Sequence, residues 1–189
     1  MACTTTLTNI STSCGANMAS IKKLWIGGYE SATFTFDYET GAGPDGTDVI
    51  EDVKTAVLGA GEDAWVSFEF KKNTGEMTTE MTRSDNGSYY FTNAANLVFA
   101  KQDASKRLAL QAVASGECTM IIQDSNNIYW LIGYDSAVTA TTVSATTGVN
   151  VGDSNQYSVT LSADEPFMPI PLDASAVDTI ITALTPAQS

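Results

Sequence analysis

The chain has 189 residues, 43% of them hydrophobic, which suffices for one domain with a sizeable core. Nine basic and 22 acidic residues give a net charge of −13. That charge argues against binding to nucleic-acid phosphates or to anionic membrane surfaces, since both need Lys and Arg. No apolar run reaches the ~20 residues of a membrane-spanning helix. Residues 1–9 lack a signal-peptide pattern, so we expect assembly in the cytoplasm.

No motif in the sequence predicts catalysis. There is no histidine, no phosphate-binding glycine loop and no nucleophile elbow. The cysteines Cys3, Cys14 and Cys118 are odd in number and have no histidine to join them at a metal, so we interpret them as small apolar residues. The segments Gly152–Asn155 and Asp164–Glu165 supply too few oxygen ligands for calcium, which needs about six. We predict no enzyme activity, no cofactor and no metal.

Taken in chain order, the first elements are short strands. Ser20–Ile26 predicts a strand that ends at Gly27 and Gly28. Phe34–Tyr38 predicts a second strand, with its three aromatic side chains on one face. Ala64–Lys72 predicts a third, whose apolar face is Val66, Phe68 and Phe70.

The segment around residues 47–57 fits two structures. Its apolar spacing favours a short helix capped by Thr47 or Asp48, whereas its β-branched side chains favour a strand. The apolar residues in question are Val49, Ile50, Val53, Ala56 and Val57.

A long hairpin and one helix are predicted in the middle of the chain. Asn73–Gln102 contains Asn86-Gly87 between two strand-like runs, and this pair is a strong hairpin signal. Asp103 then caps a helix over Ala104–Ser115, which ends at Gly116. The side chains expected to be buried on this helix are Leu108, Leu110, Ala112 and Val113.

The segment Glu117–Glu165 predicts an antiparallel meander. Its strands are Cys118–Gln123, Ile128–Tyr134, Val138–Thr146 and Gln156–Ser162, separated by turn-forming residues. In the last strand Tyr157, Val159 and Leu161 alternate with polar residues, which indicates one buried and one solvated face. The sequence therefore predicts a mainly β fold, an antiparallel β-sandwich or partial barrel with one packed helix and a long projecting hairpin.

The order of these pieces resembles a family of tail-tube-like virion proteins from phages that infect Bacteroidetes. The resemblance rests on Asn126–Gly133 (NNIYWLIG), the Thr-rich strand after it, Thr147–Pro166 (TGVNVGDSNQYSVTLSADEP), and the start of the chain through Ser20–Ile26 (SIKKLWI). Together these stretches cover somewhat over a third of the chain.

The resemblance implies a role and partners. Subunits of this family close into a ring, which implies a homo-oligomer, hexameric by expectation, whose inner wall is a continuous β-barrel. The rings stack into a tube, or one ring serves at the head–tail junction, beside other tail or portal-proximal proteins. DNA passes through the channel without specific binding, and an acidic lumen keeps it from sticking.

Two segments are expected at subunit contacts. The chain divides into a β domain (1–165) and a C-terminal arm (166–189), whose prolines keep it extended before a possible short helix. This arm either folds back on its own domain or crosses to a neighbouring subunit. The predicted contacts are Met77, Met81, Arg83, Asn86, Gly87, Tyr89 and Phe91 in the hairpin, with Phe167, Met168, Ile170, Ile180 and Leu184 in the arm.

A second function from another class remains open at this point. Tyr89-Tyr90-Phe91 and Tyr129-Trp130 provide aromatic rings on which a carbohydrate-binding β-sandwich stacks its ligand. Neighbouring residues of a strand face opposite ways, so one ring of each pair is expected in the core. A monomer at every concentration would favour this carbohydrate-binding module over a ring-forming protein.

Overall fold

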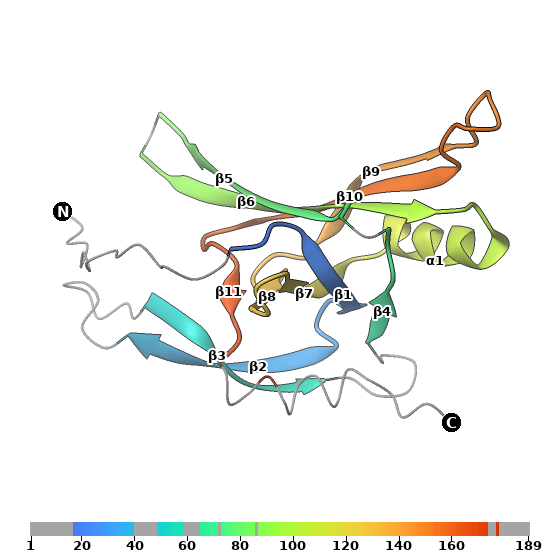
Figure 1. Ribbon diagram of the computed structural model, residues 1–189. Helices are drawn as coiled ribbons and strands as arrows, with labels where there is room; N and C mark the ends of the chain where they lie inside the picture. Colours follow the sequence, from blue (N-terminus) through green and yellow to red (C-terminus); the bar gives the residue numbers. More distant parts are fainter. Residues whose placement is uncertain are drawn as a thin grey trace.

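The computed structural model describes residues 17–39, 49–58, 65–71, 73–85, 87–173 and 177, and these form three antiparallel sheets with one helix (Figure 1). The mainly β, sandwich-like fold with one helix is confirmed, and the described sheets do not close into a barrel. No helix in these ranges is long and apolar enough to span a membrane.

The sheets are stacked as three layers in Figure 1. The five-stranded middle sheet has the order β11 (Ile170–Pro171), β8 (Tyr129–Ile132), β7 (Cys118–Asp124), β1 (Ile21–Gly28) and β4 (Val66–Phe68). The four-stranded sheet above it has the order β5 (Glu76–Arg83), β6 (Tyr89–Ala100), β10 (Gln156–Glu165) and β9 (Thr139–Thr146). Below lie β2 (Ala32–Glu39) and β3 (Val49–Leu58).

The middle sheet is buried on both faces. Leu24 of β1 and Ile122 of β7 belong to the core cluster shared with β6 and β10. Their neighbours Trp25 and Ile121 belong to the second cluster, with Phe36 of β2 and Val53 of β3. Successive side chains of a strand point to opposite faces, so an uninterrupted apolar run such as that of β7 fills both interfaces.

In the first half of the chain the structure decides one open alternative and corrects two predictions. Of the helix and the strand left open around residues 47–57, the strand is found: residues 49–58 form β3, which pairs with β2 and contributes Val53 to the lower core. Of the apolar face predicted over Ala64–Lys72, Phe68 and Phe70 pack against the core cluster shared with β6 and β10, but Val66 is 57% exposed. Trp65, which was predicted on the opposite face, is buried in the second cluster. Trp65 packs on Gly27, where a Cβ would clash with its ring, so β1 continues through both glycines instead of ending there.

The helix α1 (Ala104–Ser115) has the predicted ends but a smaller buried face. The Asp103 carboxylate accepts a hydrogen bond from the Lys106 backbone N–H at 2.8 Å, which is the predicted cap. Only Leu110 is buried, with Val113 packed beside it, while Leu108 is 59% exposed. At ~100° per residue Leu108 and Leu110 lie on opposite sides of a helix, so the predicted four-residue face was wrong.

The predicted meander is two hairpins in two different sheets. β7 pairs with β8 in the middle sheet, whereas β9 pairs with β10 in the upper one. The chain crosses between the layers over residues 133–138, where Gly133 has φ +85° and Val138 bridges to Cys118. A left-handed residue turns the chain out of β8, and this requirement favours glycine.

The beginning of the C-terminal arm folds back on its own domain. Ile170 pairs with Leu131 at the edge of the middle sheet, and the Leu172 N–H donates to the Tyr129 carbonyl at 2.9 Å. The Asp173 N–H then donates to the Val53 carbonyl at 3.0 Å, which links the middle and lower layers. Of the two possibilities left open for the arm, folding back on its own domain therefore holds for residues 170–173. Pro171 is tolerated there because β11 is an edge strand.

Candidate functional site

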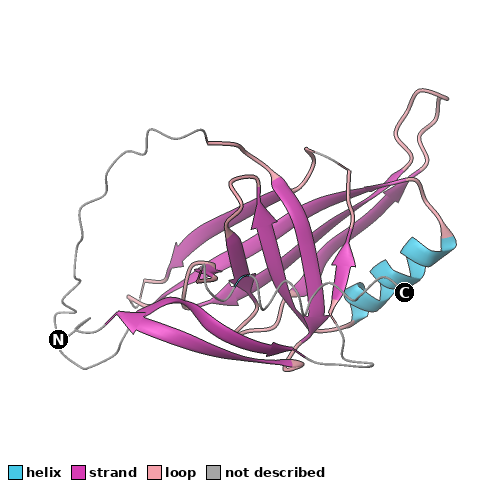
Figure 2. Ribbon diagram, turned by 60° about the horizontal axis from the view of Figure 1, so that its bottom comes forward, coloured by secondary structure: helices cyan, strands magenta, loops and turns pink. Residues whose placement is uncertain are grey.

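The outer face of the four-stranded sheet is left uncovered by the other described layers (Figures 1 and 2). Its inward positions fill the core with Leu97, Phe99, Val159 and Leu161. Its outward positions are set by the register, and most of them carry a hydroxyl or an amide. They are Glu76, Thr78, Glu80 and Thr82 of β5; Tyr90, Thr92, Ala94, Asn96, Val98 and Ala100 of β6; Gln156, Ser158, Thr160, Ser162 and Asp164 of β10; and Thr139, Thr142, Ser144 and Thr146 of β9. Tyr90 is the one large ring among them and is 39% exposed.

Hydrogen bonds tie this outer face together across the strands. The Thr160 hydroxyl donates to Asn96 Oδ1 at 2.8 Å, and the Thr92 hydroxyl donates to Asp164 Oδ1 at 2.6 Å. The Ser144 hydroxyl reaches the Ser158 carbonyl at 3.5 Å. Such cross-strand bonds hold the polar side chains in fixed positions.

The charges on this face all have one sign. Glu76, Glu80 and Asp164 point outward from β5 and β10, and the register places Glu80 and Asp164 on either side of Thr92. None of the outward positions of these four strands is Lys or Arg. A surface of this kind repels phosphates.

The edges of the sheet are β5 and β9, and no described strand continues the sheet beyond them. Every neighbouring pair within it is antiparallel. With four alternating strands, β9 of one copy placed beside β5 of a rotated second copy would again be antiparallel. An unpaired edge offers N–H and C=O groups for such pairing.

The residues predicted at the hairpin lie together at one end of this sheet. Met77, Met81 and Arg83 are on the inward side of β5, opposite Ala95, Phe91 and Tyr89 of β6 in that order. Beyond the core this side is exposed: Met81 is 57% and Tyr89 54% exposed. Gly87 has φ +90° at the turn, as its hairpin role requires, and Asn86 lies outside the described residues.

The arm residues divide into three groups. Phe167 and Met168 lie beside the hairpin, because Asn93 of β6 donates to the Phe167 carbonyl at 3.0 Å. Ile170 is buried in its own subunit, in the cluster shared by the middle and lower layers. Ile180 and Leu184 lie outside the described residues. The structure thus joins the hairpin to the start of the arm, which sequence reasoning treated as separate.

A buried carboxylate that sequence reasoning missed holds this region together. Glu165 is 5% exposed, and its Oε1 accepts from the backbone N–H groups of Gly133, Tyr134 and Asp135 at 3.1, 2.9 and 3.3 Å. Its Oε2 accepts from Asn93 Nδ2 at 2.9 Å. Burial raises the pKa of Glu165, and these four hydrogen bonds oppose the rise.

In this network each polar atom of Asn93 has a defined role as donor or acceptor, and the network spans three strands. Asn93 is fully buried, and its Oδ1 accepts from the Thr79 hydroxyl at 3.0 Å while Nδ2 donates to both Glu165 and Phe167. The network therefore fixes β5, β6, β10, the crossover and the arm with one another. The signal was available in the sequence: the alternation Tyr157, Val159, Leu161 and Ala163 continues to Glu165, which predicts an inward carboxylate.

Most of the aromatic side chains considered for carbohydrate stacking contact other side chains of the protein. Tyr129 is half-buried with its ring centroid 6.1 Å from Trp25. Trp130 is half-buried as well, and its Nε1 donates to Asp124 Oδ2 at 3.3 Å. Tyr89 and Phe91 are exposed or half-buried but meet edge to face, at an interplanar angle of 84°. Stacked sugars need accessible ring faces, which this geometry limits.

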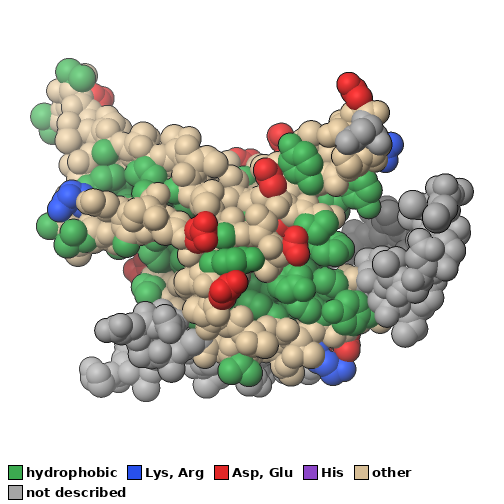
Figure 3. Space-filling view, turned by 180° about the vertical axis from the view of Figure 1, so that it is seen from behind, with side chains coloured by type: hydrophobic (Ala, Val, Ile, Leu, Met, Phe, Trp, Pro, Cys, Tyr) green, Lys and Arg blue, Asp and Glu red, His purple; other side chains and the backbone are tan. Residues whose placement is uncertain are grey.

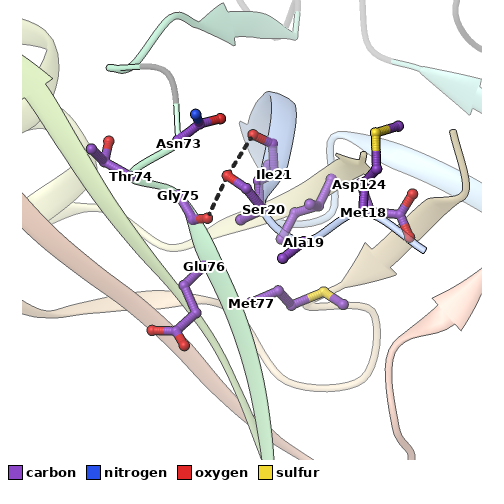
Figure 4. Close-up of a pocket in the computed structure, with 11 residues that line it drawn as sticks. Met18, Ala19, Ser20, Ile21, Asn73, Thr74, Gly75, Glu76, Met77 and Asp124 are labelled. Carbon is purple, nitrogen blue, oxygen red and sulfur yellow. Dashed lines mark hydrogen bonds between the residues drawn. The ribbon is translucent and has the colours of Figure 1, made fainter. Parts of the chain in front are cut away.

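A groove of about 580 Å³ lies between the starts of β1 and β5 (Figure 4). The Ser20 hydroxyl on its wall donates to the Gly75 carbonyl at 3.0 Å, and Met18 and Met77 supply apolar surface. The nearby Asp124 Oδ1 accepts from the Asn126 and Ile128 N–H groups, so this oxygen is used by the β7–β8 turn. Among the described residues no three Cys, Asp or Glu come together as a metal site.

We found no family model, curated protein or solved structure that matches this chain.

Proposed function

We propose that this protein is a phage virion structural protein of the tail-tube-like kind that its sequence resembles. Its copies close into rings that line a channel for DNA, either stacked as a tube or used once at the head–tail junction. It acts in the virion tail, after assembly in the host cytoplasm, beside other tail or portal-proximal proteins. The role is structural, with no catalysis, cofactor or membrane contact.

The observation that carries this proposal is the outer face of the four-stranded sheet. It combines hydroxyl and amide side chains, three carboxylates and no basic residue, and its two edges are open. Pairing β9 with β5 of the next copy closes a barrel and removes both edges. The acidic face then lines the lumen, where it repels DNA phosphates and lets DNA pass.

Charge sets a condition on assembly. Each copy brings −13, so the copies repel one another beyond their contact surfaces. Salt screens this repulsion, with a Debye length of about 8 Å at physiological ionic strength. Ring formation is therefore expected to strengthen between low salt and about 0.5 M salt. The carbohydrate-binding alternative predicts a monomer at all salt concentrations.

The test combines sizing with negative-stain imaging over a range of protein concentrations. We expect annular particles with an open centre. A triple variant, Glu76→Lys, Glu80→Lys and Asp164→Lys, locates the lumen, because annular particles of this variant should bind single- or double-stranded DNA in a salt-dependent way. The matched control is Glu30→Lys, Glu69→Lys and Glu117→Lys, which adds the same charge outside this face. Equal DNA binding by both variants, or a monomer throughout, contradicts the proposal.

A further inference from the structure

One end of the four-stranded sheet carries a tip of exposed valines. The valine tip, residues 148–152, connects β9 and β10 and projects away from the core (Figures 1 and 3). Val149 is 96% exposed and Val151 is 108% exposed, more than any other large hydrophobic residue described. Two valines so fully in water on a projecting loop are accessible to another molecule.

Hydrogen bonds to Asp153 hold the backbone of the valine tip in place. Asp153 Oδ2 accepts from the N–H groups of Val149 and Asn150 at 2.8 and 2.7 Å, and the Asp153 N–H donates to the Asn150 carbonyl at 3.0 Å. The carboxylate is thus turned into the loop. A loop that is ordered before binding loses less entropy when it docks.

The opposite end of the same sheet carries a second apolar surface. This hairpin patch consists of Met81, Tyr89 and Phe91, where Met81 and Phe91 are register partners and the rings of Tyr89 and Phe91 lie 5.9 Å apart. Phe167 lies beside the patch through the hydrogen bond that its carbonyl accepts from Asn93. Next to it Met168 is 59% exposed.

We propose that the valine tip of one copy docks on the hairpin patch of a second copy in the adjacent ring. This inference rests on the proposed function and specifies which surfaces join ring to ring. The occupant is another copy because one chain supplies both surfaces, at opposite ends of one sheet (Figure 1). Such a head-to-tail contact does not close on itself, so it repeats along a tube.

Charge and area decide how this contact works. Val149 and Val151 bring no charge, so the contact adds no like-charge pair to the repulsion that already acts between copies of net charge −13. Two valines against three larger side chains bury far less than the roughly 1,200 Å² of a stable pair. A single contact is therefore weak, and only a whole ring of them holds. We expect stacking to be cooperative and no stable dimer to form through these surfaces.

Disulfide trapping tests the contact directly. In a background with Cys3→Ser and Cys14→Ser, Tyr89→Cys and Val151→Cys are combined in one chain. Tyr89 begins β6, whereas Val151 precedes Gln156, which pairs with Ala100 at the other end of β6, so a bond between the two cysteines joins two copies. We expect oxidation of assembled protein to give a reducible ladder of multimers. Val57→Cys with Tyr89→Cys, which uses a valine that is 72% exposed on β3, should give none. A dimer from Val151→Cys alone means tip-to-tip contact and overturns the proposal, as does assembly without a ladder.

A polar replacement of the same shape gives the second test. Val149→Thr with Val151→Thr should raise the concentration needed for stacking by about tenfold or more, while isolated rings persist. Val57→Thr should leave stacking unchanged. Loss of the rings themselves would assign the valine tip to contacts within a ring and overturn this inference alone. A wild-type protein that never assembles overturns both this inference and the proposed function.

Discussion

Two carboxylates of this protein bind loops in the same way but in opposite surroundings. Glu165 accepts from three consecutive backbone N–H groups of the crossover, and Asp153 accepts from two consecutive ones in its own loop. Burial raises the pKa of Glu165, whereas the backbone hydrogen bonds lower that of the exposed Asp153. Similar hydrogen bonds therefore accompany opposite pKa shifts, because loss of water outweighs them only in the buried site.

The largest effect is expected from placing a second carboxylate beside the buried one. Asn93→Asp puts an oxygen where Asn93 Nδ2 now donates to Glu165 at 2.9 Å. Two carboxylates in one buried site share a proton, so we expect a loss of about 3 kcal/mol or more of unfolding free energy at pH 7. The loss should shrink as the pH falls, because the folded pair binds a proton that the unfolded chain does not.

Chemical denaturation at several pH values measures this effect. Asn96→Asp, on the same strand but on the outer face, keeps the acceptor used by Thr160 and serves as the control. Equal losses in the two variants would show that the buried network is not responsible.

Glu165→Gln should have the next largest effect. An amide nitrogen replaces one acceptor oxygen, although all four groups that contact this carboxylate are donors. Rotation of the Asn93 amide cannot repair this, because its oxygen would then face the Phe167 carbonyl. We expect a loss of about 1–3 kcal/mol in unfolding free energy at neutral pH. Asp164→Asn, one residue away and exposed, is the control. If Glu165→Gln had the same unfolding free energy as the wild type, the hydrogen-bond network of Glu165 would not stabilise the fold.

The two carboxylates should also contribute to stability with opposite pH dependence. The raised pKa of Glu165 means that the protonation-linked part of its contribution is complete below its ordinary value of 4.5 and is lost as the pH rises through the folded pKa. The loss in Glu165→Gln should therefore be larger in acid than at neutral pH, where only the hydrogen bonds of the carboxylate remain to be lost. The lowered pKa of Asp153 means that its contribution is present above 3.8 and is lost as the pH falls. Subtracting the unfolding free energies of Glu165→Gln and Asp153→Asn from the wild type at each pH isolates the two groups. If the two differences in unfolding free energy changed with pH in the same direction, the opposite pKa shifts assigned to Glu165 and Asp153 would be contradicted.

The smallest effect is expected from Asp153→Asn at neutral pH. The Asn oxygen still accepts from the Val149 and Asn150 N–H groups, and only the charge is lost on an exposed loop. The melting temperature should change less than for Glu165→Gln, whereas Asp153→Ala, which removes the acceptor, should make the loop more accessible to proteases. Unchanged proteolysis in Asp153→Ala would show that the carboxylate does not order the valine tip.

Local chemistry explains which parts of the fold could be predicted from the sequence. Asp103 caps α1 and Gly87 turns the β5–β6 hairpin through contacts within a few residues, so both were predicted correctly. Residues 49–58 were left open between helix and strand because the choice depends on pairing with β2. The burial of Leu108 was wrongly predicted, although the ~100° per residue of a helix places it opposite the buried Leu110. The carboxylate network joins Asn93 to Glu165 across 72 positions. The alternation predicted for residues 156–162 would have placed Glu165 on the inward face only if it had been extended to residue 165.

The strand order of the upper sheet also has a consequence for the timing of synthesis. β5 and β6 form a hairpin early, but β6 gains its other neighbour only when β10 has been made, since Phe91 pairs with Glu165. Contacts over such separations form late in folding. In a nascent chain the edge strand β5 is therefore made long before the other edge strand, β9. Ring closure, as proposed, needs both edges, so unfinished chains on neighbouring ribosomes cannot propagate a barrel.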